Sequence, residues 1–372
     1  MGAVERWSLE WQVRFSVKKC ESMLFREKNV RVRQQFEVRL YGECLPHVTE
    51  IRYLGVWFDA HLTWHRQIME ATTRARARLW LLRRLDGRDW GLDPYLFLRL
   101  VRGAVLPMLY YGAKCWALVL CSSTRLAALD AVTATAARMA FRLERTTSVE
   151  ASLVMAGLEP ARQSVMRHLV RHLVRRHGAA LRDDLASQAC GRRATPLELG
   201  VTWFRRSMQG KFLADPSFPF RCRIIYEGID RAIKAEWSRR WAASEMRSAL
   251  REIVTTVGQA WMPRDASRGS RLDLLETARF ITGHCHVGAF AVPWHVDEWA
   301  ICPWCGDDFT REHILWECRG LSHERQAFLG EPELEEFESL GQFVLFYGLR
   351  IGRFLRAAGS LLVSMGASRG QT

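Results

Sequence analysis

The first sixty residues alternate between hydrophobic and polar positions. Along residues 11–17 every second side chain is apolar, and polar or charged residues fill the positions between. A period of two is typical of a strand with one buried and one exposed face, and the segments 36–40 and 51–58 continue the pattern, the latter interrupted by Gly55. Residues 1–60 are therefore predicted to form a small antiparallel sheet at the edge of a larger domain.

From residue 61 onward the hydrophobic positions recur every three or four residues, which is the period of an amphipathic helix. The first helix places Ile68, Ala71, Ala75, Leu79 and Leu82 on one face. Gly87 and the segment 89–94 end it, and the pattern predicts further helices over 95–104, 123–143 and 162–177.

The predicted fold class is mainly α with a small antiparallel β element at the N-terminus. Five regions follow from the changes in pattern: strands over 1–60, a helical domain over 61–178, a helical linker region over 179–265 to which no chemistry is assigned, a cysteine-containing domain over 266–330, and an acidic run followed by an apolar helix over 331–372. The last helix is expected over 343–362.

Arginines accompany two of these helices. On the first helix they lie mostly off the apolar face and include Arg74, Arg78, Arg83 and Arg84. On the helix 162–177, Arg167, Arg171 and Arg175 lie four residues apart. Such rows occur both as solvated helix faces and as phosphate-binding surfaces, so the pattern leaves both interpretations open.

Composition favours a polyanionic partner. The 372 residues carry a formal net charge of +14, and clustered Lys and Arg bind a phosphate backbone without needing sequence information. Nucleic acid is the expected partner, with an anionic membrane surface as the alternative. Ten cysteines in a chain of this length do not suggest a secreted disulfide framework, so a reducing compartment, nuclear or cytoplasmic, is expected.

No membrane segment is predicted. The most apolar window, 101–120, is interrupted by Arg102, Pro107 and Lys114, which favours a buried helix over a bilayer span. The N-terminus also lacks the apolar region of a signal peptide.

The segment 302–318 has the spacing C-x2-C-x7-H-x4-C. Three thiolates and one imidazole, from Cys302, Cys305, His313 and Cys318, would fill the four positions of a tetrahedral structural Zn²⁺ site. Such a site has no open position for a water nucleophile, which argues against a zinc hydrolase. The alternative is four unrelated buried residues. His284 and His286 are further candidates for contacts around the metal or with nucleic acid.

Several stretches, in this order, resemble the C-terminal part of a non-LTR (LINE-like) retrotransposon reverse transcriptase. They are WQVRFSVKKCESMLF at 11–25, IRYLGVW at 51–57, VLPMLYYGAKCW at 105–116, TTSVEASLVMAGLEP at 146–160 and RFITGH at 279–284, followed by the cysteine cluster. The resemblance covers most of the chain and is weakest from about residue 180 to 265. It is closest to the branch in which a nuclease precedes the polymerase, which includes the type-1 elements that insert into ribosomal RNA genes.

The resemblance implies roles for particular residues. Residues 1–60 would supply palm-edge strands and a primer grip around Tyr53, Leu54 and Gly55, and Lys19 matches the lysine that closes the palm. That lysine would donate a proton to pyrophosphate only when the rest of the palm is present. Residues 61–178 would form a thumb on the template RNA and primer, and Trp304 of the zinc knuckle would contact single-stranded RNA or target DNA during target-primed reverse transcription.

The family's catalytic carboxylates come from an early aspartate and a hydrophobic-x-Asp-Asp hairpin, and the chain is expected to begin downstream of both. They hold Mg²⁺, which is therefore expected only in the complete polymerase. Asp307 and Asp308 lie inside the predicted zinc loop, and Asp183 and Asp184 lie in a polar helical context, so neither pair is predicted to be a polymerase site. The chain alone is expected to bind nucleic acid without polymerising it.

A second hypothesis is a host zinc-binding protein that binds nucleic acid or acts as an adaptor. It accounts for the charge and the cysteine cluster, but it leaves the ordered stretches unexplained.

Overall fold

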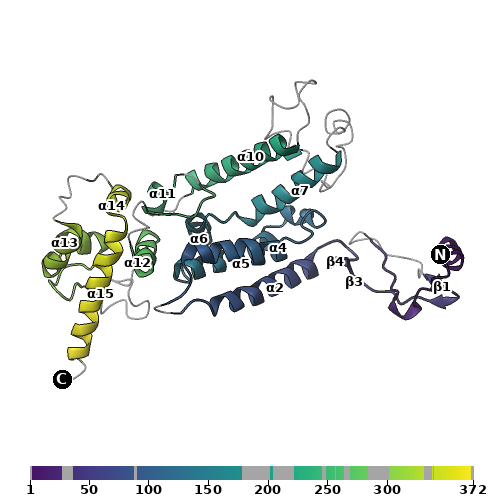
Figure 1. The fold of residues 1–372 in the computed structure, drawn as a ribbon, viewed down its shortest axis with the longest axis horizontal. Helices are drawn as coiled ribbons and strands as arrows, with labels where there is room; N and C mark the ends of the chain where they lie inside the picture. Colours follow the sequence, from purple (N-terminus) through teal and green to yellow (C-terminus); the bar gives the residue numbers. More distant parts are fainter. Residues whose placement is uncertain are drawn as a thin grey trace.

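The structure is a computed structural model that describes residues 2–26, 37–87, 90–177, 202–203, 222–244, 249–255, 257–263, 269–283, 301–330, 337 and 339–369. These residues form a mainly helical chain with two small antiparallel sheets near the N-terminus, as predicted. The N-terminal elements lie at one end, a group of helices in the middle, and helices α12 to α15 at the other end (Figure 1).

The N-terminal region contains less sheet than the sequence predicts. Its elements are α1 (Gly2–Glu10), a 3₁₀ turn η1 (Val17–Lys19), β1 (Arg39–Leu40), β2 (Glu43–Cys44), β3 (Glu50–Tyr53) and β4 (Val56–Asp59). The predicted strand along 11–17 is wrong, because no strand forms there and a 3₁₀ turn begins at Val17. The ring of Trp7 in α1 instead stacks on those of Trp11 and Phe15, with centroid distances of 6.3 and 6.0 Å. These aromatic residues recur every four positions, a spacing that places side chains on the same side of a helical turn. In the strand predicted over 36–40, residue 36 lies outside the described residues, and β1 covers Arg39–Leu40.

Strands β3 and β4 form the predicted hairpin, with Glu50 opposite Asp59 and Tyr53 opposite Val56. Leu54 and Gly55 make the turn with φ values of +47° and +84°, and a two-residue turn with both φ positive matches the twist of the strands it joins. The hydroxyl of Tyr111 donates to the Leu54 carbonyl at 3.0 Å, which ties the hairpin to the helical domain.

The middle of the molecule follows the predicted helical pattern. Its elements are α2 (His65–Arg83), α3 (Pro94–Leu100), a π-helical turn η2 (Val101–Val105), α4 (Leu106–Leu109), a 3₁₀ turn η3 (Ala117–Cys121), α5 (Ser123–Phe141), α6 (Val149–Ala156) and α7 (Ala161–His177). Side-chain oxygens of Asp93, Ser122 and Ser148 accept backbone N–H groups at the starts of α3, α5 and α6, and Gly157 ends α6 in the left-handed conformation. The predicted helix over 95–104 is interrupted by a π-helical turn before Pro107, which lacks an N–H for the regular ladder.

The remaining helices are α10 (Cys222–Ala242), α11 (Ala249–Ile253), α12 (Arg271–Ile281), a π-helical turn η4 (His313–Glu317), a 3₁₀ turn η5 (Arg319–Leu321), α13 (Ser322–Leu329), α14 (Leu340–Tyr347) and α15 (Leu349–Arg369). Helix α10 packs on α7, and α15 packs on α12 (Figure 1). The single helix predicted over 343–362 is wrong, since Gly348 adopts a φ of +54° and a ψ of −127° and separates α14 from α15.

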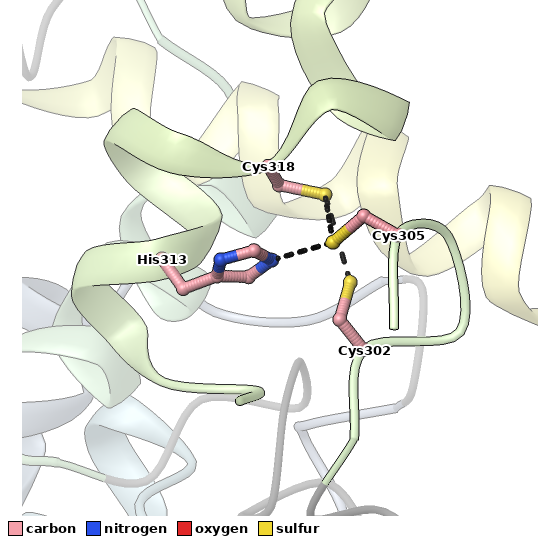
Figure 2. Close-up of side chains that lie close together, drawn as sticks. All are labelled: Cys302, Cys305, His313 and Cys318. Atoms are coloured by element: carbon pink, nitrogen blue, oxygen red, sulfur yellow. Dashed lines mark hydrogen bonds between the residues drawn. The ribbon is translucent and has the colours of Figure 1, made fainter. Parts of the chain in front are cut away.

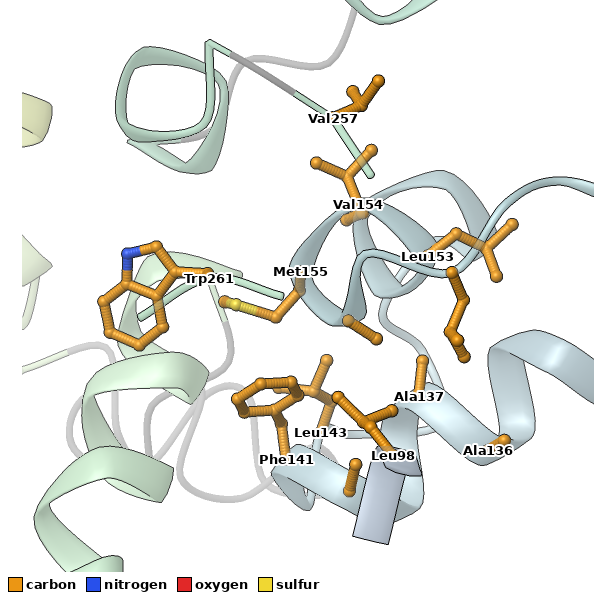
Figure 3. Packing of buried hydrophobic residues seen from close by; sticks show 14 of the residues in the cluster. Leu98, Ala136, Ala137, Phe141, Leu143, Leu153, Val154, Met155, Val257 and Trp261 are labelled. Carbon is orange, nitrogen blue, oxygen red and sulfur yellow. The ribbon is translucent and has the colours of Figure 1, made fainter. Parts of the chain in front are cut away.

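One buried hydrophobic cluster extends from Val56 to Ala358 and joins these regions. Figure 3 shows Met155 of α6 between Trp261 and the residues of α5, including Phe141. The backbone N–H of Trp261 donates to the Met155 carbonyl at 2.8 Å, and the Tyr95 hydroxyl donates to the Trp261 carbonyl at 2.9 Å. The segment around Trp261 is therefore fixed to the helical domain by both packing and hydrogen bonds.

Helices α12 and α15 approach each other closely. A Cβ atom on Gly352 of α15 would lie 2.0 Å from the backbone oxygen of Asp273 in α12, so only glycine fits at this position. In the part of the chain that the structure describes, no helix has the length and apolar character needed to cross a membrane.

Candidate metal centre and basic residues

Cys302, Cys305, His313 and Cys318 come together as the sequence predicts (Figure 2). Their ligand atoms all lie within 4.8 Å of one another. The Sγ atoms of Cys302 and Cys318 are 3.6 Å apart, those of Cys305 and Cys318 are 3.9 Å apart, and Cys305 Sγ lies 3.1 Å from His313 Nε2. The four residues therefore form a cluster that could hold a metal ion.

Local backbone structure holds the first two cysteines. The N–H of Cys302 donates to the Asp307 carbonyl at 2.6 Å, and the N–H of Gly306 donates to the Cys302 carbonyl at 2.9 Å. Gly306 has a φ of +85°, which closes this tight turn without a Cβ penalty. The turn directs the thiols of Cys302 and Cys305 to one point.

The other two ligands come from the π-helical turn His313–Glu317 and the residue after it. Thr310 Oγ1 accepts the N–H of His313 at 3.0 Å, and the N–H of Cys318 donates to the His313 carbonyl at 2.8 Å. The sequence predicted a short helix here, and the wider π turn brings the thiol of Cys318 beside the imidazole of His313.

The spacing of the donors fits a closed tetrahedral site. With Zn–S bonds of about 2.3 Å, two sulfurs on a tetrahedral metal are about 3.8 Å apart. The two S···S separations of 3.6 and 3.9 Å agree with this value and are far longer than the roughly 2.05 Å of a disulfide bond. Three sulfurs and one imidazole are a donor set typical of Zn²⁺.

The cluster is shielded from solvent. Cys302, His313 and Cys318 are at most 2% exposed, and burial raises the pKa of the Cys318 thiol to about 12. A bound cation would favour the thiolate forms that burial alone disfavours. His313 Nδ1 lies 3.6 Å from a carboxylate oxygen of Glu317, a placement suited to orienting the imidazole. Sequence reasoning missed Glu317, although its i,i+4 spacing from His313 was a usable signal.

Trp304 packs within the lobe that contains the Cys₃His cluster. Its ring makes an edge contact with Phe309 at a centroid distance of 5.8 Å, and a Cβ atom on Gly320 would lie 2.2 Å from its own Cβ. Trp304 is only partly exposed, so its predicted contact with nucleic acid stays a prediction about the exposed part of the ring. Asp307 and Asp308 lie in the turn between the ligands, where Asp308 pairs with Ile301 in an isolated β-bridge.

The predicted arginines of α2 lie along one helix that leads away from the hairpin. Arg74 is partly buried and its Nε donates to the Glu70 carbonyl at 3.3 Å, whereas Arg78, Arg83 and Arg84 are exposed. Three of the four side chains are thus accessible to a ligand.

The arginines of α7 are largely engaged within the protein. Arg167 pairs with Glu159 and lies 3.4 Å from Asp230 of α10, and Arg171 pairs with Asp230 at 2.5 Å. Arg175 is exposed. Two of the three guanidinium groups therefore hold α7 to α10, and their predicted phosphate contact would compete with these carboxylates.

The primer-grip candidates lie at the tip of the β3–β4 hairpin, where Tyr53 and Leu54 are 63% and 76% exposed, beside Gly55. Lys19 is exposed at the end of the turn η1. His284, His286, the pair Asp183–Asp184 and the acidic residues of 331–336 lie outside the described residues.

Comparisons with known proteins identify relatives along most of the chain. It is 23% identical over 305 residues to the retrovirus-related Pol polyprotein from type-1 retrotransposable element R1 4 of Nasonia vitripennis, covering 80% of this chain and 67% of that protein. It is 24% identical over 323 residues to a putative 115 kDa protein in type-1 retrotransposable element R1DM of Drosophila melanogaster, covering 86% of this chain and 28% of that protein.

A shorter match, 31% identical over 86 residues, is to the RNA-directed DNA polymerase from mobile element jockey of Drosophila funebris, covering 22% of this chain and 9% of that protein. No protein-family model and no solved structure matches the chain. The similarities to the two R1 proteins each extend over at least four fifths of the chain. The chain is a homologue of the Pol polyproteins of R1-type non-LTR retrotransposons.

Proposed function

We propose that this chain is the thumb and C-terminal metal-binding region of a retrotransposon RNA-directed DNA polymerase. It would bind template RNA, primer and target DNA during target-primed reverse transcription. The observation that carries this proposal is the closed Cys₃His cluster in a basic, mainly helical chain whose relatives over most of its length are retrotransposon Pol polyproteins.

Nucleic-acid binding by this region is supported by charge and exposure. The chain has a formal net charge of +14, and the exposed guanidinium groups of Arg78, Arg83 and Arg84 lie along α2 and at its C-terminal cap. Arginine binds phosphate through two parallel hydrogen bonds, so a row of exposed arginines suits a nucleic-acid backbone. The exposed tip of the β3–β4 hairpin, with Tyr53 and Leu54, would contact the primer, and Lys19 would act only beside a complete palm.

The metal would be a structural Zn²⁺. The four protein ligands leave no position for water, so a bound zinc ion would cross-link the turn at Cys302–Cys305 to the π turn at His313 and Cys318. The residues themselves exclude solvent, and Glu317, 3.6 Å from His313 Nδ1, would orient the imidazole. This lobe would then present Trp304 and nearby residues to a single strand.

Binding and metal content test the proposal together. The purified chain should bind labelled RNA and single-stranded DNA with an affinity that falls steeply with salt, and should contain about one zinc per chain. A primer-extension reaction with Mg²⁺ should yield no product from residues 1–372 alone. Failure to bind any nucleic acid at low salt, or robust nucleotide incorporation, would refute the proposal.

A further inference from the structure

A basic cavity lies where the C-terminal ends of α2 and α5 meet helix α12. Its volume is about 740 Å³, within the range of small-molecule sites. Five arginines line it together with the indole of Trp80: Arg83, Arg138, Arg142, Arg145 and Arg279. Asp86 is the carboxylate among the described lining residues, and it pairs with Arg142 and Arg271. The cavity therefore has an excess of positive charge.

Two of these arginines are fixed parts of the wall. Arg138 donates from Nε and Nη2 to the Thr147 carbonyl, at 3.1 and 2.5 Å, and Arg279 donates from Nε to the Arg142 carbonyl at 2.9 Å. Arg138 is partly buried, and this burial lowers the pKa of its guanidinium. An anion in the cavity would restore favourable interactions to such a group.

The remaining wall is an accessible platform. Trp80 is 54% exposed, and the Cζ atom of Arg83 lies 5.0 Å from the centroid of its ring. Arg83 and Arg145 are exposed, and neither has a carboxylate partner among the residues that the structure describes. Indole and guanidinium planes stack on nucleobases, and free guanidinium groups bind phosphate oxygens.

We propose that this cavity binds one nucleotide of a single-stranded nucleic acid, with its phosphate between Arg83 and Arg145 and its base stacked on Trp80. The inference rests on the proposed nucleic-acid-binding function and deepens it by naming a strand contact at the junction of the thumb and the C-terminal region. A base must be unstacked to reach Trp80, so a single strand fits this cavity and a blunt duplex does not. The same chemistry accepts RNA and DNA strands.

The test compares matched variants of the full chain. The double variant R83A/R145A and the variant W80L alter exposed side chains of the cavity, and R231A/R239A removes the same charge from the exposed surface of α10. Binding of fluorescein-labelled oligouridylate and oligothymidylate, each about ten nucleotides long, is followed by anisotropy over a range of salt concentrations. Circular dichroism and zinc content check that each variant is folded.

R83A/R145A should weaken binding at least tenfold and reduce the slope of log Kd against log salt by about 0.7, because the contact with one phosphate is lost. W80L should weaken binding about tenfold without changing that slope, because stacking is insensitive to salt. A loss confined to one oligonucleotide would identify RNA or DNA as the strand bound here.

Three results would overturn the inference: equal effects of R83A/R145A and R231A/R239A, full affinity in W80L, or equal losses for a blunt duplex of the same length. If the unaltered chain binds both oligonucleotides and the cavity variants bind them equally well, this inference fails and the proposed function stands. If the unaltered chain binds neither, the proposed function fails as well.

Discussion

Asp273 is predicted to dock helix α15 onto helix α12. Its side chain is 4% exposed and accepts the Ser270 N–H at 3.0 Å, Arg353 Nε at 3.2 Å and Arg356 Nη1 at 2.8 Å. The Ser270 contact completes a capping box at the start of α12, and the two arginine contacts come from α15. One carboxylate thus caps one helix and attaches another.

Replacing Asp273 by Asn keeps the size of the side chain and one acceptor oxygen, but removes the charge and leaves an amide facing two guanidinium groups. Loss of a buried charge-assisted hydrogen bond costs about 1.5–3 kcal/mol. Arg353 and Arg356 are 42% and 43% exposed, so water replaces part of their interaction. We therefore expect Asp273→Asn to lower the free energy of unfolding by about 2 kcal/mol in total.

The assay combines urea unfolding with amide hydrogen exchange, because separate regions of a chain of this size need not unfold together. Exchange should accelerate most in α12 and α15, and little in α2 and α5. Glu70→Gln is the matched control: it removes a carboxylate from the partly exposed i,i+4 pair of Arg66 and Glu70, and should cost only about 0.3–0.5 kcal/mol.

The effect should depend on pH in a defined direction. Burial acts to raise the pKa of Asp273, but hydrogen bonds from Ser270, Arg353 and Arg356 lower it below its usual range. A group with a lowered folded-state pKa stabilises the fold above its unfolded pKa, about 3.9, and loses this contribution as the pH falls through the folded value. This account would be refuted if Asp273→Asn lowered the free energy of unfolding by less than about 0.5 kcal/mol, or if its effect were the same at pH 7 and pH 2.

Three further predictions follow from single positions. Cys305→Ser should lower zinc content, measured by atomic absorption, and increase hydrogen exchange across 301–330; unchanged zinc would contradict the ligand assignment. Burial raises the pKa of Asp130 to about 6, although the hydrogen bond from the Ala161 N–H acts to lower it. The ionised carboxylate therefore destabilises the fold increasingly as the pH rises from about 4 to 6. Over that window the free energy of unfolding of Asp130→Asn, measured in urea, should rise by up to about 3 kcal/mol relative to the unaltered chain. A gain that is the same at pH 4 and pH 7 would contradict it. Gly352→Ala should lower the melting temperature, because the added methyl group forces α15 away from Asp273. Gly359→Ala, in open space on the same helix, should leave the melting temperature unchanged or raise it. Equal effects of the two substitutions would argue against the close contact between the helices.

The spacing of apolar residues predicted much of the fold, because it follows the period of the helix or strand that those residues form. The apolar spacing placed α2, α5 and α7 within a few residues of their observed bounds. The same logic failed along residues 11–17, where a strand pattern coincides with aromatic side chains that stack on Trp7 of helix α1. Short apolar segments are compatible with more than one backbone period, and tertiary contacts decide between them.

The sequence by itself determined the candidate metal-ligand set, since C-x2-C-x7-H-x4-C names four candidate donors before any geometry is known. It also established the excess of basic residues that favours a polyanionic partner. Only the tertiary structure decided which arginines remain available: Arg167 and Arg171 are paired with acidic residues of other segments, whereas Arg83 and Arg145 face a cavity beside Trp80. The physical reason is that ligand spacing within a short segment is constrained by the local backbone, while the partner of a surface charge is set by segments distant in sequence that folding brings within a few ångströms.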